Sequence, residues 1–204
     1  MSDAPPAGAP AQGGLPLDEL IAGLTVDIPD HPEPGVLFRD LTPVFADGGA
    51  FRRVVAGLAA PEASDPRAAA VLAGRGRAGD PGFDVVVGVE ARGFLLAAAV
   101  AFDCGVGVVP VRKAGKLPRE CVSADYALEY GTATLEMHAD SIRPGARVLV
   151  VDDVLATGGT LGAAIGLVER LGGVVAAVSV VVELAALQGR ERIAPHVVHA
   201  LWTT

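Results

Sequence analysis

The sequence predicts an α/β protein with a doubly wound parallel sheet and helices on both faces of that sheet. Between residues 83 and 182, short apolar runs alternate with helical patterns, which is typical of successive β–α–β units with right-handed crossovers. Two of the runs, residues 85–89 and 148–151, contain no polar residue, as expected of central strands that are covered on both faces. A chain of 204 residues suits one domain with a substantial core.

Composition and charge narrow the class of protein. Lys and Arg number 16 against 24 Asp and Glu, and the formal net charge of −8 argues against general nucleic-acid binding. The two cysteines, Cys104 and Cys121, are too few for a disulfide framework and lack the spacing of a metal site. The N-terminus has no signal-peptide pattern, and no apolar run approaches the roughly 20 residues that span a bilayer. We therefore expect a soluble cytoplasmic protein without membrane or nucleic-acid partners.

The N-terminal part of the chain is expected to contain a helix followed by a proline-rich segment. Residues 1–14, rich in Pro, Ala and Gly, predict a disordered tail, and an amphipathic helix follows at residues 17–24. Four prolines between residues 27 and 45 predict a rigid segment without regular structure. This segment is either an ordinary surface loop or a binding loop, and apolar residues 36–38 beside Arg39 favour binding.

A second amphipathic helix is expected at about residues 50–60. The composition then changes over residues 61–82 to Ala, Gly, Arg, Pro and Asp, which predicts a surface insertion. Apart from this insertion, residues 15–204 are expected to form one domain.

Charged residues follow the first two predicted strands of the sheet. Glu90 and Arg92 come after residues 85–89, and Arg112 and Lys113 come after a second run at residues 106–111. Parallel strands present their carboxyl ends at one edge, where open α/β sheets bind ligands. The helix between these strands, residues 94–102, is apolar nearly all round, which predicts that it is buried.

Residues 112–132 form a connection that is long for a compact domain. Such connections are usually functional lids or disordered, and we predict a flexible lid loop. Lys113 and Lys116, which lie within it, are the only lysines of the chain. This clustering favours a function for them, although chance could also produce it. Residues 132–138 then alternate as a half-buried strand, and residues 174–182 are expected to form the last central strand.

The most informative stretch is VLVVDDVLATGGT, residues 148–160. Asp152 and Asp153 close the predicted strand, and a glycine-containing turn leads into a helical pattern. The turn residues share small size or a hydroxyl group, and they are Ala156, Thr157, Gly158, Gly159 and Thr160. Glycines let the backbone approach an anion, and the first N–H groups of a helix are free to bind one. The pattern is neither a P-loop nor GxGxxG, so we expect a phosphate site that takes no nucleoside triphosphate or dinucleotide.

The two carboxylates beside this phosphate site point to a second part of the ligand. Because carboxylates repel phosphate, they are expected to face sugar hydroxyls or Mg²⁺. A ligand with a phosphate, a ribose and a metal-bound pyrophosphate accounts for every group, and phosphoribosyl pyrophosphate carries all three. The alternative is a strand–turn–helix whose acidic turn and glycines serve geometry alone.

Residues 148–160 resemble the phosphoribosyl-pyrophosphate signature of the purine and pyrimidine phosphoribosyltransferase family. Five more stretches match the adenine-specific branch of the family in order, namely PGVLFRDLTP, GVEARGFL, VPVRKAGKLPRE, LEYGTATLEMH and VELAALQGRERIAP. The resemblance covers residues 17–192 except residues 61–82. It implies a parallel α/β core, a small N-terminal hood over the base, a lid loop and a homodimer. The implied reaction transfers phosphoribose from phosphoribosyl pyrophosphate to adenine, giving AMP and pyrophosphate with the help of Mg²⁺, as in purine salvage.

The same resemblance implies a binding site for each part of the sugar substrate. The 5′-phosphate would lie against Ala156, Thr157, Gly158, Gly159 and Thr160. Asp152 and Asp153 would hold the ribose hydroxyls and nearby magnesium-bound water, so no direct protein ligand of the metal is expected. Pyrophosphate would be bound by Arg92, Lys113 and Lys116, and Arg112 would reach across a dimer to the pyrophosphate of the other subunit.

The resemblance also implies roles around the base. Glu129 would manage the proton of adenine, with Tyr130 adjacent and Arg92 completing the catalytic group. The residues that match positions enclosing the adenine ring are Leu37, Phe38, Arg39 and Leu184. The N-terminal tail, residues 61–82 and the end after Pro195 match nothing in the family.

Two rival functions are less well supported. One is the same reaction on hypoxanthine, guanine or xanthine, whose enzymes typically carry a lysine beyond the phosphate loop to donate to the exocyclic oxygen. This chain has no lysine after Lys116. The other is a non-catalytic regulator that senses phosphoribosyl pyrophosphate and binds DNA. The net charge, the lack of a helix-turn-helix pattern and the presence of Glu129 argue against it.

Overall fold

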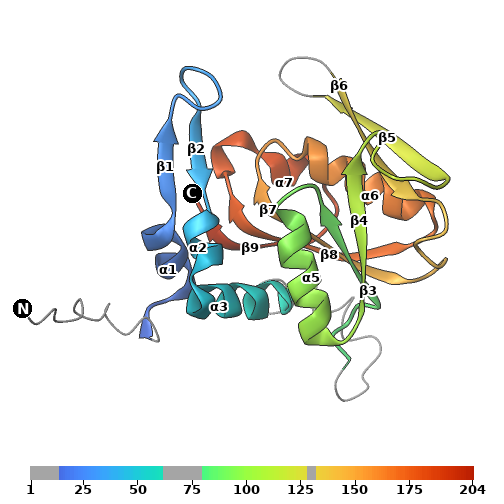
Figure 1. The fold of residues 1–204 in the computed structure, drawn as a ribbon, viewed down its shortest axis with the longest axis horizontal. Helices are drawn as coiled ribbons and strands as arrows, with labels where there is room; N and C mark the ends of the chain where they lie inside the picture. The colour runs from blue at the N-terminus through green and yellow to red at the C-terminus, as the bar shows by residue number, and fades with distance from the viewer. Residues whose placement is uncertain (1–13, 62–79, 128–131) are drawn as a thin grey trace, which may run out of the picture. The chain divides into compact units, whose positions relative to one another are not determined.

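The computed structural model describes residues 14–61, 80–127 and 132–204. These residues fall into two compact units, one ending at Arg53 and the other beginning at Val54 (Figure 1). Helix α3 (Gly48–Leu58) runs through the boundary, within two residues of the limits that its sequence predicts. Each unit is described by itself.

The N-terminal unit combines short helices with a two-stranded sheet. Helix α1 (Leu17–Leu24) has the predicted bounds and buries Leu20 and Ile21 on its apolar face. Strands β1 (Val26–Pro29) and β2 (Leu37–Asp40) pair antiparallel, and helix α2 (Thr42–Ala46) follows. This unit corresponds to the small hood that the family resemblance implies.

The prediction that residues 27–45 lack regular structure is wrong. Pro29 is the last residue of β1, and Pro32 and Pro34 lie in the connection to β2, so none of the three interrupts the middle of a strand. Pro43 lies in the first turn of α2, where a missing N–H leaves no helical hydrogen bond unmade. Each proline therefore occupies a position that regular structure tolerates, which a count of prolines does not reveal.

In the described part of the second unit, seven strands form one sheet in the order β5-β6-β4-β3-β7-β8-β9. Their bounds are β3 (Val85–Val89), β4 (Gly107–Lys113), β5 (Cys121–Ala127), β6 (Thr132–His138), β7 (Arg147–Leu155), β8 (Val174–Glu183) and β9 (Val198–Thr203). The five strands from β4 to β9 in this order are mutually parallel, whereas β6 and β5 add to β4 as antiparallel strands. The predicted parallel core is confirmed, but the complete sheet is mixed.

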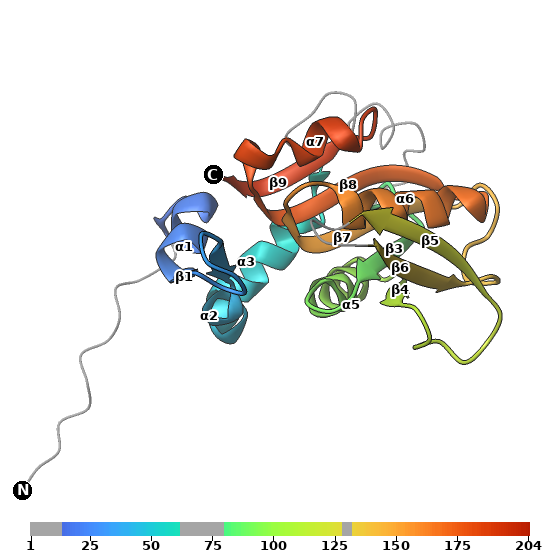
Figure 2. The ribbon, with the colours of Figure 1, turned by 90° about the horizontal axis from the view of Figure 1, so that it is seen from above.

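Helices cover both faces of this sheet, as predicted. Helix α5 (Gly93–Cys104) lies on one face and helix α6 (Gly159–Arg170) on the other (Figure 2). Two short elements, the 3-10 turn η3 (Ala185–Leu187) and helix α7 (Gly189–Arg192), connect β8 to β9. The central strands β7 and β8 are buried almost throughout, which is why their sequences contain so few polar residues.

Strand β5 corrects the prediction of one continuous loop over residues 112–132. Its residues pair with β6 from Cys121 opposite His138 to Ala127 opposite Thr132. The pairing partner, β6, is a separate segment of the chain, so the local sequence of β5 alone does not identify a strand. Among the described residues of this stretch, 114–120 lack strand structure.

Helix α5 is not buried on all sides, contrary to prediction. Leu96, Ala97 and Val100 face the sheet and are buried, whereas the side chains of Leu95 and Phe102 are 58% and 90% exposed. The helix is a single layer over the sheet, so its outer face meets solvent although it is apolar.

At the amino ends of the parallel strands, the buried Arg147 at the start of β7 pairs with two aspartates. The Arg147 guanidinium donates to Asp84 Oδ1 at 2.7 Å and to Asp80 Oδ1 at 3.0 Å. These two bonds raise the pKa of Arg147 above its usual value and hold Asp80 and Asp84 beside the start of β7. The predicted insertion is described only at residues 61 and 80–82, and the predicted tail only at Gly14.

Strand β9 was not predicted from the sequence. It contains His199 and Trp202, and it pairs in parallel with β8 from Val198 opposite Val178 to Thr203 opposite Glu183. In the described ranges, no helix combines the length and apolar character needed to cross a bilayer.

Candidate active site

The strands β3, β4, β7 and β8 deliver their carboxyl ends to one edge of the sheet. Val89 lies opposite Val111, and Leu155 opposite Glu183, so the connections that follow these strands start side by side. This is the edge at which open α/β sheets bind ligands. The predicted site residues of the second unit that the structure describes lie on these connections or in the last residues of the strands.

Residues 156–160, which we call the phosphate loop, connect β7 to α6. Gly158 is the N-cap of α6 with φ +80°, a left-handed conformation that glycine adopts without strain. No side chain caps the helix, so its first N–H groups remain for an anion, with the positive end of the helix dipole behind them. Asp152 and residues 154–161 line a hollow of about 70 Å³ at this point, several times the space that one water molecule needs. The geometry therefore suits a phosphate group.

The phosphate loop packs directly against the start of helix α7. A Cβ placed on Gly158 would lie 2.6 Å from the Gly189 carbonyl oxygen and 3.3 Å from Arg192 Cβ. A Cβ placed on Gly189 would lie 2.1 Å from the Ala156 carbonyl oxygen and 2.9 Å from the Gly158 nitrogen. Both glycines are thus required by close approach of two backbone segments.

Asp152 is a buried carboxyl group that lines the hollow. Its Oδ1 accepts a hydrogen bond from the Asp153 N–H at 2.9 Å, and a Cβ on Gly93 of α5 would lie only 2.8 Å from the same oxygen. Burial, followed by the negative charge of Asp153, raises the pKa of Asp152 well above its ordinary value. Its position on the lining of the hollow suits hydrogen bonding to ribose hydroxyls.

Asp153 forms an ion pair with Arg92. Arg92 Nε lies 2.7 Å from Asp153 Oδ2, and the side chains are 30% and 10% exposed. The sequence predicted that the acidic pair ends the strand, but β7 continues through both aspartates to Leu155 and pairs Asp152 with Val180 of β8. Strand pairing fixes both carboxylates more rigidly than a turn would.

The turn after β3 and the end of β4 are joined through Glu90. Its Oε2 accepts from the Lys113 N–H at 3.0 Å and from Arg112 Nε at 3.3 Å. Burial by itself raises the pKa of Glu90, but the Lys113 amide and the Arg112 guanidinium outweigh it, and the net pKa is lowered. The Arg112 guanidinium also lies over the ring of Phe94, 5.9 Å from its centroid. Glu90 and the Phe94 ring therefore fix the position of the Arg112 guanidinium at the end of β4.

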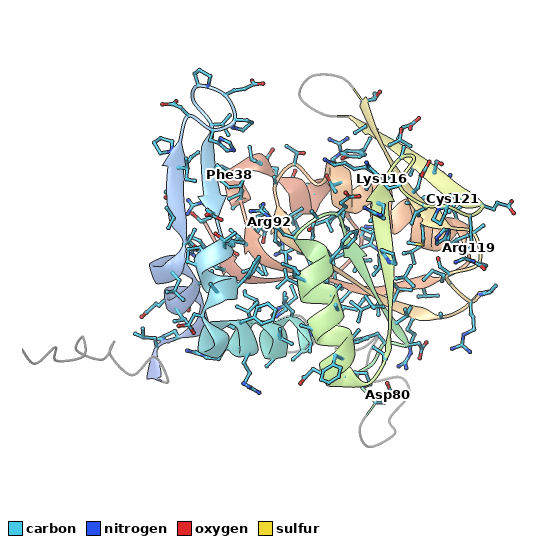
Figure 3. All side chains as sticks on the ribbon, in the orientation of Figure 1. Phe38, Asp80, Arg92, Lys116, Arg119 and Cys121 are labelled. Carbon is cyan, nitrogen blue, oxygen red and sulfur yellow. The ribbon has the colours of Figure 1, made fainter. Side chains whose placement is uncertain are left out.

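The predicted pyrophosphate residues lie on these two connections. Arg92 precedes α5, whereas Lys113 and Lys116 are exposed at the end of β4 and in the turn beyond it. Figure 3 shows Arg92 and Lys116 near the carboxyl edge of the sheet. The Lys116 carbonyl accepts from Arg112 Nη1 at 3.3 Å, which restrains the backbone between the two lysines.

Comparison with known proteins identifies the family. Residues 47–200 match the model of the phosphoribosyl transferase domain. Adenine phosphoribosyltransferase of Salinispora arenicola is 55% identical over 190 residues, which cover 93% of each chain. The chain belongs to the adenine phosphoribosyltransferase family.

Solved structures of the family have the same fold. The enzyme of Thermoanaerobacter pseudethanolicus is 43% identical with a TM-score of 0.79, covering 91% of this chain and 99% of that one. The Saccharomyces cerevisiae enzyme, solved with adenine and an imino-altritol bisphosphate, is 35% identical with a TM-score of 0.79, covering 91% and 98%. The α/β fold and the family resemblance of the sequence are therefore confirmed.

The residues predicted to enclose the base are divided between the two units. Leu37, Phe38 and Arg39 form part of β2, where Phe38 lies edge-on to His31 and Arg39 Nη1 is 3.6 Å from Asp27 Oδ1. Figure 3 shows Phe38 on this strand. Leu184 directly follows β8, and its N–H donates to the Leu155 carbonyl at 2.9 Å. Glu129 and Tyr130 lie outside the described residues.

Sequence reasoning missed several residues that support the site. Gly93 and Gly189 each admit a close backbone approach, and a Glu183–Arg190 ion pair joins the end of β8 to α7. The glycines stand in the matched stretches GVEARGFL and VELAALQGRERIAP, which is the one signal that could have singled them out. Their neighbours are distant in sequence, so spacing alone gives no reason to choose them.

Proposed function

We propose that this chain transfers the 5-phosphoribosyl group of phosphoribosyl pyrophosphate to adenine in the cytoplasm, releasing AMP and pyrophosphate. The observation that carries this proposal is the uncapped, glycine-containing phosphate loop beside the buried Asp152 and the Arg92–Asp153 pair. The choice of adenine is supported by the names of the relatives and by the adenine in the yeast structure.

The 5′-phosphate and the ribose are assigned to neighbouring parts of the site. N–H groups at the start of α6 and the hydroxyls of Thr157 and Thr160 would donate to the phosphate. Asp152 and Asp153 would hydrogen-bond the ribose hydroxyls. Strand β7 holds both carboxylates and the phosphate loop follows it directly, so the sugar would be bound at two points on rigid backbone, which fixes C1′ for displacement.

The pyrophosphate is assigned to Arg92, Lys113 and Lys116. Cationic groups placed where negative charge develops stabilise a leaving group most effectively in a site with little water. In the described residues, no group of three or more His, Cys, Asp or Glu side chains could hold a metal ion. The acidic pair instead suits Mg²⁺ that keeps its waters and is bound mainly by substrate oxygens. When bound, Mg²⁺ neutralises charge on the leaving pyrophosphate.

The base would be enclosed by Leu37, Phe38, Arg39 and Leu184. Adenine attacks C1′ through a ring nitrogen and loses a proton from the ring, and Glu129 is the proposed acceptor of that proton, with Tyr130 beside it. A positioned carboxylate typically contributes about 10²–10⁴ in rate.

We also propose that the chain acts as a homodimer. Leu95 and Phe102 lie seven residues apart and thus on one face of α5, and Val108 of the adjacent strand β4 is also exposed, at 48%. Exposed apolar surface of this kind marks protein–protein contacts. Arg112 lies on the same strand as Val108, in agreement with its proposed contact with the pyrophosphate of the other subunit.

Turnover with different bases tests the proposal. Purified protein is given phosphoribosyl pyrophosphate, Mg²⁺ and either adenine, hypoxanthine or guanine, and nucleotide formation is followed by chromatography. We expect kcat/KM for adenine to exceed that for the 6-oxopurines by about 10⁴ or more, since a site that hydrogen-bonds one exocyclic group rejects its analogue. Comparable turnover of adenine and hypoxanthine would refute the choice of base, and absence of any nucleotide product would refute the reaction.

A further inference from the structure

The segment from Glu183 to Arg192 contacts the phosphate loop without belonging to it. It begins at the end of β8, passes through Leu184 and η3, and ends in the short helix α7. Two features of this segment are not required by the reaction proposed above: the lack of a side chain at residue 189, and a bidentate ion pair between Glu183 and Arg190.

Gly189 fits against the backbone of the phosphate loop with no space to spare. Its nearest neighbours, measured from an added Cβ, are the Ala156 carbonyl oxygen at 2.1 Å, Leu155 Cδ1 at 2.8 Å and the Gly158 nitrogen at 2.9 Å. Two of these three atoms are backbone atoms of the phosphate loop, so any side chain at residue 189 must displace the loop or α7.

The ion pair fixes the place from which Gly189 approaches. Arg190 Nε donates to Glu183 Oε1 at 2.9 Å, Arg190 Nη2 donates to Glu183 Oε2, and Arg190 Nη1 donates to the Val198 carbonyl at 2.7 Å. Glu183 is buried at the carboxyl end of β8, and Val198 is the first residue of β9. A planar guanidinium that makes all three bonds has little freedom to rotate. Arg190 thereby anchors the adjacent Gly189 to two strands of the sheet.

The same segment also forms a hydrogen bond to the residue that precedes the phosphate loop. Leu184 N–H donates to the carbonyl of Leu155, the residue that precedes the phosphate loop, at 2.9 Å. The segment thus holds the loop at Leu155 through one end and at Ala156 and Gly158 through the other.

We propose that Gly189 and the Glu183–Arg190 ion pair are positioning residues that hold the phosphate loop in its phosphate-binding conformation and connect it to Leu184. This inference rests on the proposed function, because it assigns the loop to the 5′-phosphate of the substrate. None of the three residues needs to contact the substrate. Each acts through the backbone of residues 155–158, whose conformation sets the direction in which the loop N–H groups point.

Equilibrium binding of two partial ligands tests this inference in the full chain. Ribose 5-phosphate probes the phosphate loop, and pyrophosphate with Mg²⁺ probes the side of the site formed by Arg92 and the two lysines. In Gly189→Ala, loss of one charge-assisted hydrogen bond should raise the Kd of ribose 5-phosphate roughly 10- to 100-fold. The Kd of pyrophosphate should change less than twofold, because the turn after β3 and the end of β4 are not displaced.

The matched control is Gly166→Ala, on α6. An added Cβ at Gly166 meets nothing within 4 Å, so this variant should bind both ligands as the wild type does. If Gly189→Ala also binds ribose 5-phosphate within threefold of the wild type, the positioning role is wrong. If the wild type binds neither ligand and makes no nucleotide, the proposed function is wrong instead.

Substitution of Arg190 gives a second test that does not depend on the folding of Gly189→Ala. Arg190→Met removes the ion pair and should raise the Kd of ribose 5-phosphate roughly 3- to 10-fold. Arg190→Lys keeps a positive charge near Glu183 and should recover part of the lost affinity. A role in stability alone would lower the melting temperature and leave the Kd unchanged in both variants. That result would overturn the role of the ion pair.

Discussion

Substitution of Gly158 by alanine tests the phosphate loop with the smallest possible side chain. At φ +80° an L-residue is strained, by roughly 1–2 kcal/mol for the left-handed conformation. The new Cβ would also lie 2.6 Å from the Gly189 carbonyl oxygen, which must move by at least about 0.4 Å to reach 3.0 Å. Overpacking of this kind typically costs about 1–3 kcal/mol. The total, about 2–5 kcal/mol, corresponds to a melting temperature lowered by roughly 4–20 °C in a chain of this size.

A loss of phosphate binding is expected in addition to the effect on folding. The loop can relieve both strains only by changing the backbone that presents its N–H groups to the phosphate. Loss of one or two charge-assisted hydrogen bonds, each about 1.5–3 kcal/mol, raises the Kd of phosphoribosyl pyrophosphate by roughly 10- to 10⁴-fold. Titration calorimetry gives the Kd, and scanning calorimetry of the same samples gives the melting temperature and shows that the variant is folded.

The control for this variant is Gly162→Ala, one turn further along α6. Its Cβ would lie 3.6 Å from Ile193 Cγ2, an ordinary van der Waals contact, and alanine favours a helix interior by about 0.5–1 kcal/mol over glycine. We expect Gly162→Ala to bind as the wild type does and to melt slightly higher. Unchanged affinity in folded Gly158→Ala would show that the loop does not bind the phosphate as argued.

Three further predictions concern the acidic pair, Glu129 and the proposed dimer. The pKa of Asp152 is raised in the folded state, so its ionisation destabilises the folded protein increasingly as the pH rises above about 3.8. Asp152→Asn should therefore have a higher melting temperature than the wild type at pH 8 and a smaller increase at pH 4, while its kcat falls. An increase in melting temperature that does not depend on pH would contradict the assigned burial effect. Glu129→Ala should lower kcat by about 10²–10⁴ with little change in the Kd of phosphoribosyl pyrophosphate, whereas near-normal kcat would exclude a proton-transfer role. Phe102→Asp should dissociate the dimer in analytical ultracentrifugation, and a monomeric wild type with full activity would refute the dimer. Mixing Arg112→Ala chains with Gly158→Ala chains should change activity in a way that independent subunits cannot.

Local sequence was sufficient wherever the determining interactions are local. The bounds of α1, β3 and β6 follow directly from apolar periodicity, and the turn into α6 follows from the glycines at its start. The phosphate loop could be recognised for the same reason, since strand, acidic pair, glycines and helix are consecutive in the chain.

Predictions failed where a residue's environment comes from elsewhere in the chain. Strands β5 and β9 depend on partners that supply their hydrogen bonds, and neither stands out in sequence. The four prolines of residues 27–45 predict a segment without regular structure, yet each occupies an end, a connection or a first helical turn. Helix α5 was predicted to be buried from its composition, but exposure depends on whether anything packs on its outer face.

The sequence by itself determined the α/β class, the family, the phosphate loop and the residue types that the reaction needs. Only the tertiary structure decided how these residues are held: Arg92 against Asp153, Glu90 between Arg112 and the Lys113 amide, and Gly189 against Ala156. The physical reason is that a chemical group is specified by one residue, whereas its position and pKa are set by neighbours. These neighbours lie up to 61 residues away, as Arg92 and Asp153 do, and the folded sheet brings them together.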